Sequence, residues 1–325
     1  MKKTKAIFLI LFLFFIILII SGCSNYNEIN NVMLVDGIGI DKINNKYVVS
    51  FNTYLQNDKY EVIDVEVETL DKAFNEIYLT VNKKIYLSHL NILFLSSNLS
   101  NDDINDIFNT FNNRNDLRGT FLITMVYDYN QNIFNNESLY IVNLLNNNYM
   151  ESGDIYPTTF NEMLSEYLNL SISYIPIINN NDLKIIGMHS LFSEYRFYNL
   201  NESKYLNLLS NKLSSSVFVL DDEEVRIDNI DVCYEVKENN ITFKLYLSHS
   251  SNLNNNEIES FLTENINSFF ELDINNYYFL NLIKKKAYAY FNNHDSFSIS
   301  YNIEIFLNKE YITNIKEDDL LEKDK

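Results

Sequence analysis

The chain has 325 residues, of which 46% are hydrophobic and 21% are charged, and its net charge at pH 7 is −19. This apolar content is too high for a disordered chain, and the length suffices for two or three domains with their own cores. The acidity argues against binding to nucleic acid or anionic lipid, because both need clustered Lys and Arg. Asn is abundant but dispersed among periodic apolar residues, which favours an AT-rich genome over a prion-like segment.

Residues 1–22 have the features of a signal peptide. Lysines at positions 2, 3 and 5 precede an apolar run from Ala6 to Ile20, which is shorter than the roughly 18–20 residues that span a membrane. Small residues then precede Cys23 in the sequence Ser21-Gly22-Cys23, which resembles a bacterial lipobox. We therefore expect cleavage before Cys23 and acylation of this residue. The alternatives are an ordinary signal peptide and an uncleaved anchor.

Acylation of Cys23 has two consequences for the mature protein. Two acyl chains anchor a protein stably, whereas one chain does not. Removal of the three lysines of the signal peptide changes the net charge from −19 to −22, so the lipid, rather than the protein surface, would hold the chain at the membrane. Cys233 would then be the sole thiol. It lies in an alternating segment, which favours a small strand residue over a reactive thiol.

The mature chain begins with extended segments. Val32 to Ile40 and Tyr47 to Leu55 flank a polar turn and predict a β-hairpin, and Val62 to Val67 predicts a half-exposed strand. Apolar residues spaced three and four apart then predict a helix from Leu70 to Ile85. The next expected elements are a strand over 89–96, a helix over 102–111 and a strand over 120–127.

The alternation of strands and helices up to residue 127 indicates a layered α/β unit with a partly parallel sheet. The elements expected after it are helices near 137–147 and 158–170, a loop over 175–181, a hairpin over 183–198 and a short helix over 202–213.

The carboxy-terminal third separates strands from helices. Its expected elements are strands over 217–220, 230–236 and 241–247, a long helical stretch over 257–291 and a strand over 297–307. This partial segregation favours an α+β fold class. We expect a signal peptide (1–22), an amino-terminal α/β domain (23–180), a hairpin–helix segment (181–213) and a carboxy-terminal α+β domain (214–325).

Motifs of catalysis are missing from the sequence. It has no Gly-rich phosphate loop, no Gly-x-Ser-x-Gly and no Cys-x-x-Cys, and its four His residues lack metal-ligand spacing. We expect a protein that is not an enzyme and that has no cofactor or metal.

Two glycines, Gly37 and Gly39, predict a bulge or a close backbone approach in one strand, or a tight turn before Asp41. Arg114 and Arg118 predict ion pairs at a helix–strand junction, with ligand binding as the alternative.

Several short motifs follow Cys23 in a characteristic order. They are Glu28-Ile29, Gly37-Ile38-Gly39-Ile40-Asp41-Lys42, Thr69 to Ala73, Tyr86-Leu87-Ser88-His89, Arg114 to Arg118, Ile186 to Phe192, and Tyr198 to Ser203. This set resembles the Ger(x)C family of spore germination lipoproteins, the C subunits of nutrient germinant receptors. The sequence departs from the family pattern at Ser24-Asn25, where Trp-Asp is usual, and at Ser88, where Gly is usual.

The resemblance implies a non-enzymatic, lipid-anchored subunit on the outer face of the spore inner membrane. Its implied partners are an A-type subunit and a permease-like B-type subunit, together with the membrane through the lipid on Cys23. A solute-binding lipoprotein of a transporter is the alternative function, and it predicts two similar lobes around a cleft. The expected structural or interface residues are Gly37, Gly39, Asp41, His89, Arg114, Arg118, Gly187 and Glu202.

Overall fold

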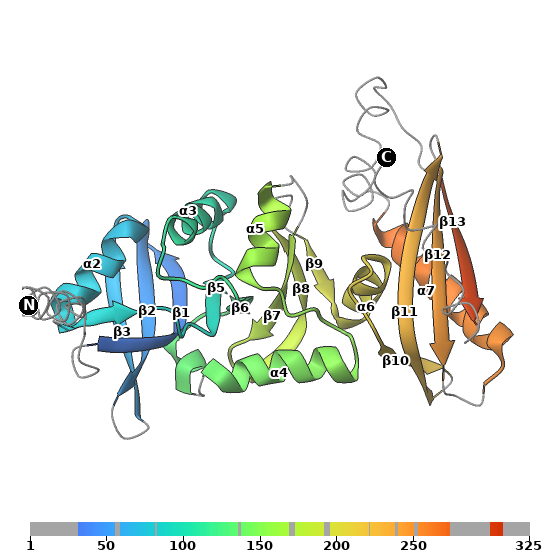
Figure 1. Ribbon diagram of the computed structural model, residues 1–325, viewed down its shortest axis with the longest axis horizontal. Coiled ribbons are helices and arrows are strands. Elements are labelled where there is room, and N and C mark those ends of the chain that lie inside the picture. The colour runs from blue at the N-terminus through green and yellow to red at the C-terminus, as the bar shows by residue number, and fades with distance from the viewer. Residues whose placement is uncertain are drawn as a thin grey trace, which may run out of the picture.

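The protein contains two β-sheets that follow one another along its longest axis (Figure 1). The structure is a computed structural model, and its fold class is α+β, as the sequence predicts. The described residues are 32–55, 59–81, 83–135, 138–168, 173–191, 196–220, 222–237, 240–249, 253–273 and 300–307.

The first sheet is mixed and has nine strands within the described ranges. Its order is β3-β2-β1-β5-β6-β7-β8-β9, and the short β4 also pairs with β1. The two outer groups, β3-β2-β1 and β7-β8-β9, are antiparallel, whereas β1, β5, β6 and β7 are parallel. The strands are β1 (Val32–Ile43), β2 (Lys46–Leu55), β3 (Lys59–Val67), β4 (Lys84–Tyr86), β5 (Ile92–Ser96), β6 (Leu122–Tyr127), β7 (Ser173–Asn179), β8 (Lys184–Leu191) and β9 (Phe197–Asn199).

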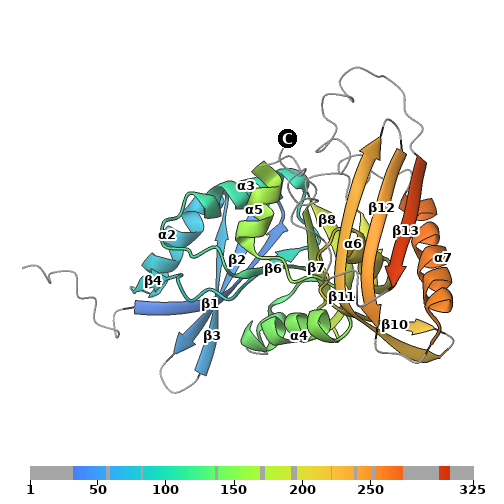
Figure 2. The ribbon, with the colours of Figure 1, turned by 45° about the vertical axis from the view of Figure 1, so that its right-hand side comes forward.

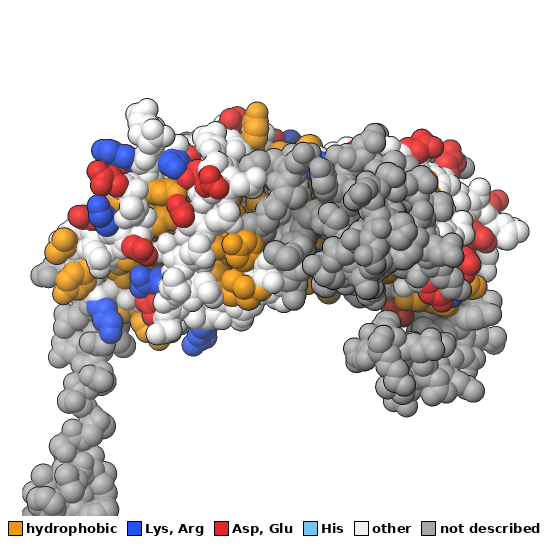
Figure 3. All heavy atoms as spheres, turned by 90° about the horizontal axis from the view of Figure 1, so that it is seen from above, with side chains coloured by type: hydrophobic (Ala, Val, Ile, Leu, Met, Phe, Trp, Pro, Cys, Tyr) orange, Lys and Arg blue, Asp and Glu red, His pale blue; other side chains and the backbone are white. Residues whose placement is uncertain are grey.

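Helices cover both faces of this sheet. On β5, Ile92 and Phe94 belong to one hydrophobic cluster, and Leu93 and Leu95 belong to the other, because successive side chains of a strand alternate between faces. One face is covered by α2 (Leu70–Val81), α3 (Asn101–Asn112) and α5 (Phe160–Leu168), and the other by the 3₁₀ helix η3 (Gln131–Asn135), α4 (Ser138–Glu151) and α6 (Leu200–Leu209). Seen from above, the side of α2 and α3 mixes acidic, basic and hydrophobic side chains (Figure 3).

The second sheet has the strand order β10-β11-β12-β13. Helix α7 packs on one face through buried apolar residues that include Leu262, Ile266 and Phe270. Helix α6 lies between the two sheets in Figure 1 and overlaps β11 and β12 in the turned view of Figure 2. One continuous hydrophobic cluster extends from the first sheet through α6 to the second. The elements are β10 (Ser216–Leu220), β11 (Glu223–Lys237), β12 (Asn240–His249), α7 (Asn255–Asp273) and β13 (Ser300–Leu307).

Most of the expected elements are confirmed. The first hairpin, the parallel part of the first sheet and the hairpin of β8 and β9 are present. The helix expected up to Ile85 instead ends at Val81, because Ile85 pairs with Met33 as part of β4. The long helical stretch is helical to Asp273, and residues 274–291 lie outside the described residues.

The loop expected over residues 175–181 is wrong, because β7 extends to Asn179. Pro176 is tolerated in this buried strand because the parallel ladder to β6 begins one residue later, at Ile177. The Pro176 carbonyl accepts a hydrogen bond from the Thr124 hydroxyl (2.9 Å). Strands β8 and β9 extend the first sheet beyond residue 180, and the division of the chain into domains stays a prediction.

Candidate functional site

A buried polar cluster lies on β1, on the face that α4 covers. The hydroxyl of Ser138, the first residue of α4, donates a hydrogen bond to Asp36 Oδ1 (3.1 Å) and accepts one from Asn52 Nδ2 (3.2 Å). All three residues are at most 9% exposed. Because buried polar groups need partners, these hydrogen bonds fix the start of α4 against β1 and β2.

Gly37 and Gly39 let neighbouring side chains approach the backbone of β1. A bulge at Asp36 precedes Gly37, and a Cβ atom on Gly37 would lie 2.4 Å from Ser138 Oγ. A Cβ atom on Gly39 would lie 1.9 Å from the hydroxyl oxygen of Tyr129. The bulge and the close approach are therefore both present, and the close approaches at Gly37 and Gly39 require residues without a side chain.

An ion-paired cluster joins β1 to α3. Lys42 Nζ pairs with Asp103, and the Tyr47 hydroxyl donates to the same carboxylate (2.8 Å). Asp103 also forms a capping box with Ser100 at the start of α3. Burial raises the pKa of Asp103, but hydrogen bonds from Lys42, Ser100 and Tyr47 outweigh this effect and lower the pKa to about 2. Asp41 accepts a bond from the Lys42 amide (2.8 Å), and β1 continues through both residues, so the turn before Asp41 is absent.

A second, partly buried polar cluster joins the first sheet to the second. Lys204 of α6 pairs with Asp154, which follows α4 (2.9 Å), and donates to the carbonyl oxygen of Val217 in β10 (2.6 Å). The Ser216 hydroxyl donates to the Ser152 carbonyl (2.6 Å). Three segments that are far apart in the sequence therefore meet through Lys204, which is 13% exposed.

His89 and Arg114 lie away from these clusters. His89 is exposed in the turn after β4, and its ring contacts Tyr86 (5.7 Å between ring centroids). Arg114 forms a fork with Asp116, with distances of 3.0 Å and 2.7 Å, and its guanidinium lies 3.9 Å from the centroid of the Phe74 ring. Arg114 thereby connects the end of α3 to α2.

The remaining residues identified from the sequence have local roles. Arg118 is exposed and makes no hydrogen bond or ion pair within the part of the chain that the structure describes. Gly187 has φ +151°, and a Cβ atom there would lie 1.9 Å from the Tyr198 carbonyl oxygen. Glu202 and Asn199 form the capping box of α6. Cys23 lies outside the described residues.

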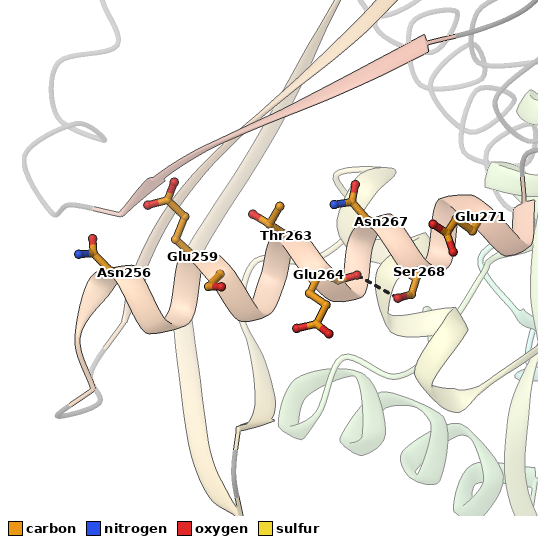
Figure 4. Close-up of a pocket in the computed structure, with 8 residues that line it drawn as sticks. Asn256, Glu259, Thr263, Glu264, Asn267, Ser268 and Glu271 are labelled. Carbon is orange, nitrogen blue, oxygen red and sulfur yellow. Dashed lines mark hydrogen bonds between the residues drawn. The ribbon is translucent and has the colours of Figure 1, made fainter.

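A shallow groove of about 580 Å³ follows the exposed side of α7 (Figure 4). Its described lining is polar and acidic and comes from one helix, with Glu259, Glu264 and Glu271 among the side chains. The Ser268 hydroxyl donates to the Glu264 carbonyl within the helix (3.0 Å). The groove therefore presents carboxylates without a balancing Lys or Arg among its described residues.

The described residues contain neither a metal-binding cluster nor a membrane-spanning helix. No group of three or more His, Cys, Asp or Glu side chains there could hold a metal ion. No described helix combines the length and hydropathy needed to cross a membrane.

The sequence did not single out Asp103 or Lys204, although both organise a buried or partly buried cluster. One local signal could have identified Asp103, namely Ser100 three residues before it at the start of an apolar periodic segment. Lys204 has no such signal, because its partners lie 13 and 50 residues away.

Known proteins resemble the chain in two comparisons. Residues 25–180 match the family model described as the spore germination protein N-terminal domain. Among solved structures, the chain is similar to one titled "Crystal Structure of the GerBC protein", with 14% sequence identity and a TM-score of 0.46. That alignment covers 83% of this chain and 96% of the other. No curated protein matches the sequence.

Proposed function

The chain belongs through residues 25–180 to the Ger(x)C family of spore germination proteins, and on this premise we propose that it is the lipid-anchored C subunit of a nutrient germinant receptor. The observation that carries the proposal is the family match, which includes the strands and helices of β1 to β7. The proposed subunit is not an enzyme. It contributes surfaces to a receptor that also contains an A-type subunit and a permease-like B-type subunit.

The buried charged groups support a role in assembly rather than in chemistry. Asp103 is held by Lys42, Tyr47 and Ser100, and Lys204 is held by Asp154 and a backbone carbonyl. Groups with these fixed partners stabilise the fold and connect its two sheets, which gives partner subunits a defined surface.

The proposed anchor is a lipid on Cys23, and the proposed location is the outer face of the spore inner membrane. Eight residues lie between Cys23 and Val32, the first residue of β1, so the nine Cα–Cα steps of a fully extended chain reach about 30 Å. The protein would therefore stay close to membrane-embedded partners. We expect Cys23→Ala to release the protein from membranes. Unchanged membrane retention, with no acyl label on the wild-type protein, would contradict acylation.

The two sheets favour this function over a solute-binding lipoprotein. That alternative predicts two similar lobes around a cleft, whereas the described sheets differ in size and strand order. In the first sheet parallel strands lie between antiparallel edges, and the second has four strands.

A deletion of the gene tests the proposed function in spores. Deletion spores are expected to lose optical density more slowly after addition of the receptor's nutrient, and to respond normally to lytic digestion of the cortex, which bypasses nutrient sensing. Complementation with the wild-type gene should restore the nutrient response. A wild-type response of the deletion spores to every nutrient that activates the parent strain would contradict the proposal.

A further inference from the structure

The end of the molecule where β1 begins carries exposed aromatic, aliphatic and basic side chains. The exposed fractions are 49% for Tyr78, 71% for Leu79 and 41% for Tyr86, and Lys83 and Lys84 are also exposed. We call these five residues the anchor-proximal surface. Figure 3 shows hydrophobic side chains together with Lys or Arg and Asp or Glu side chains at this end, on its left.

The pairing of β4 places this surface beside the first residues of β1. Lys84 is the partner of Val32, and Tyr86 is the partner of Leu34, in the parallel ladder between the two strands. Helix α2 ends at Val81, just before β4, and carries Tyr78 and Leu79. The anchor-proximal surface therefore surrounds the point at which the chain continues toward Cys23.

A row of tyrosines continues the surface across the sheet. Leu34 pairs with Tyr54, and Tyr54 pairs with Tyr60, so Tyr86, Leu34, Tyr54 and Tyr60 occupy adjacent positions on four strands. Cross-strand partners share one face of a sheet. The Tyr54 and Tyr60 rings are 5.4 Å apart. This face of the sheet thus presents aromatic groups next to the exposed Tyr86.

The segment of the sequence that carries most of this surface is basic, whereas the whole protein is acidic. The chain has 44 acidic residues, yet residues 77–91 contain two Lys and no Asp or Glu. The nearest acidic residue on α2 is Glu76, which is three positions from Leu79 and so borders the surface, whereas it is two positions from Tyr78 and does not share that side of the helix. Anionic headgroups would repel most of this acidic protein but not the anchor-proximal surface.

Tyr and Lys are suited to the boundary between water and lipid. A Tyr ring places its apolar part among acyl chains and its hydroxyl among headgroups, and Lys extends its ammonium group toward phosphate. We propose that the anchor-proximal surface lies against the phospholipid headgroups of the membrane to which Cys23 is anchored. This inference rests on the proposed lipid anchor, which limits the distance between Val32 and the membrane to about 30 Å.

The absence of Trp from the chain allows a direct test. Tyr86→Trp and Tyr78→Trp each introduce a single Trp into the full-length lipoprotein, which is then reconstituted into vesicles of phosphatidylglycerol and phosphatidylcholine with brominated acyl chains. The control is Tyr127→Trp. Tyr127 is 52% exposed and is the last residue of β6. Because β6 runs parallel to β5 and β1, Tyr127 lies at the end of the parallel strands that is opposite to Val32.

Bromine quenches Trp fluorescence at short range, so it reports contact with the membrane. We expect brominated vesicles to quench the Tyr86→Trp and Tyr78→Trp proteins at least about twofold more than the Tyr127→Trp protein. Equal quenching of the three variants would overturn the proposal. The proposal would also be overturned if the emission of the Tyr86→Trp protein shifts to shorter wavelength as the protein concentration rises and brominated lipid does not quench it. The surface would then bind another protein molecule rather than the membrane.

Flotation of the same vesicles separates the anchor from the surface. A protein that floats without position-dependent quenching is anchored but does not lie on its anchor-proximal surface. A protein that does not float lacks the anchor, which overturns both proposals.

The double variant Lys83→Glu with Lys84→Glu gives a second measurement. We expect it to reduce quenching of the Tyr86→Trp protein on vesicles with phosphatidylglycerol but not on vesicles of phosphatidylcholine alone. If the double variant and its parent are quenched equally on both kinds of vesicle, the two lysines have no role in membrane contact.

Discussion

Lys42 and Asp103 form an ion pair that joins strand β1 to the first turn of helix α3, across 61 positions of the sequence. The Asp103 side chain is 6% exposed, and it also receives hydrogen bonds from Tyr47 and from the capping residue Ser100. One carboxylate therefore stabilises both the start of a helix and its attachment to the central sheet.

Replacement of this carboxylate should weaken the fold in a pH-dependent manner. Because the pKa of Asp103 falls from 3.8 to about 2 on folding, its charge stabilises the protein above pH 3.8, and this contribution is lost as the pH falls toward 2. We expect Asp103→Asn to lower the free energy of unfolding by about 2 kcal/mol at pH 7. Urea denaturation at several pH values should show the difference shrinking below about pH 4.

The matched control is Asp102→Asn, since Asp102 is exposed in the same helical turn. Its effect should be below about 0.5 kcal/mol. Equal losses in the two variants, or a difference for Asp103→Asn that persists at pH 2, would show that the cluster does not act through its charge.

A methyl group on Gly39 should displace Tyr129. The added Cβ atom would lie 1.9 Å from the hydroxyl oxygen and 2.7 Å from Cζ. We expect Gly39→Ala to cost about 2 kcal/mol of the free energy of unfolding. The double variant with Tyr129→Phe removes the nearest atom and should recover part of this loss in urea denaturation. A double variant whose loss equals the sum of the single losses would contradict the proposed contact.

The fork between Arg114 and Asp116 predicts different behaviour for two arginines. Arg114→Lys loses the planar fork and the contact with the Phe74 ring, which should lower the free energy of unfolding by about 1 kcal/mol. Arg118→Lys, at an exposed position, should leave thermal unfolding unchanged. If both variants unfold at the temperature of the wild-type protein, Arg114 does not fix the junction.

Lys204 should control the attachment of the second sheet. Lys204→Gln removes the ion pair with Asp154 and weakens the bond to the Val217 carbonyl, both in surroundings that are mostly buried. We expect a loss of about 2 kcal/mol and faster amide hydrogen exchange in β10. Lys184→Gln is the control, because that side chain is 76% exposed and pairs with Asp182 in water. Equal exchange in both variants would exclude this role for Lys204.

The spacing of apolar residues along the sequence predicts those helices and strands that bury one side against the core. The helical spacing of Leu70, Phe74 and Ile77 and the two extended runs of the first hairpin carry this information in neighbouring residues. The glycines of β1 were also recognised, because two of the six glycines of the chain lie in one strand.

Contacts across long stretches of sequence were not predictable in the same way. The sequence predicts a loop where β7 lies because Pro176 is unusual in a central strand, and the tolerance of Pro176 depends on the register with β6. The pairing of Lys42 with Asp103 and of Lys204 with Asp154 depends on how the elements pack, so no local pattern of charged residues reveals it.

The most direct measurement of the proposed receptor role is the identification of the proteins that co-purify with the chain from detergent-solubilised spore inner membrane. A tagged wild-type protein should retain an A-type subunit and a permease-like B-type subunit, and the Cys23→Ala variant should be absent from the membrane fraction. Recovery of a transporter permease and its ATPase, or of no membrane protein from a preparation in which the tagged chain is anchored, would contradict the account.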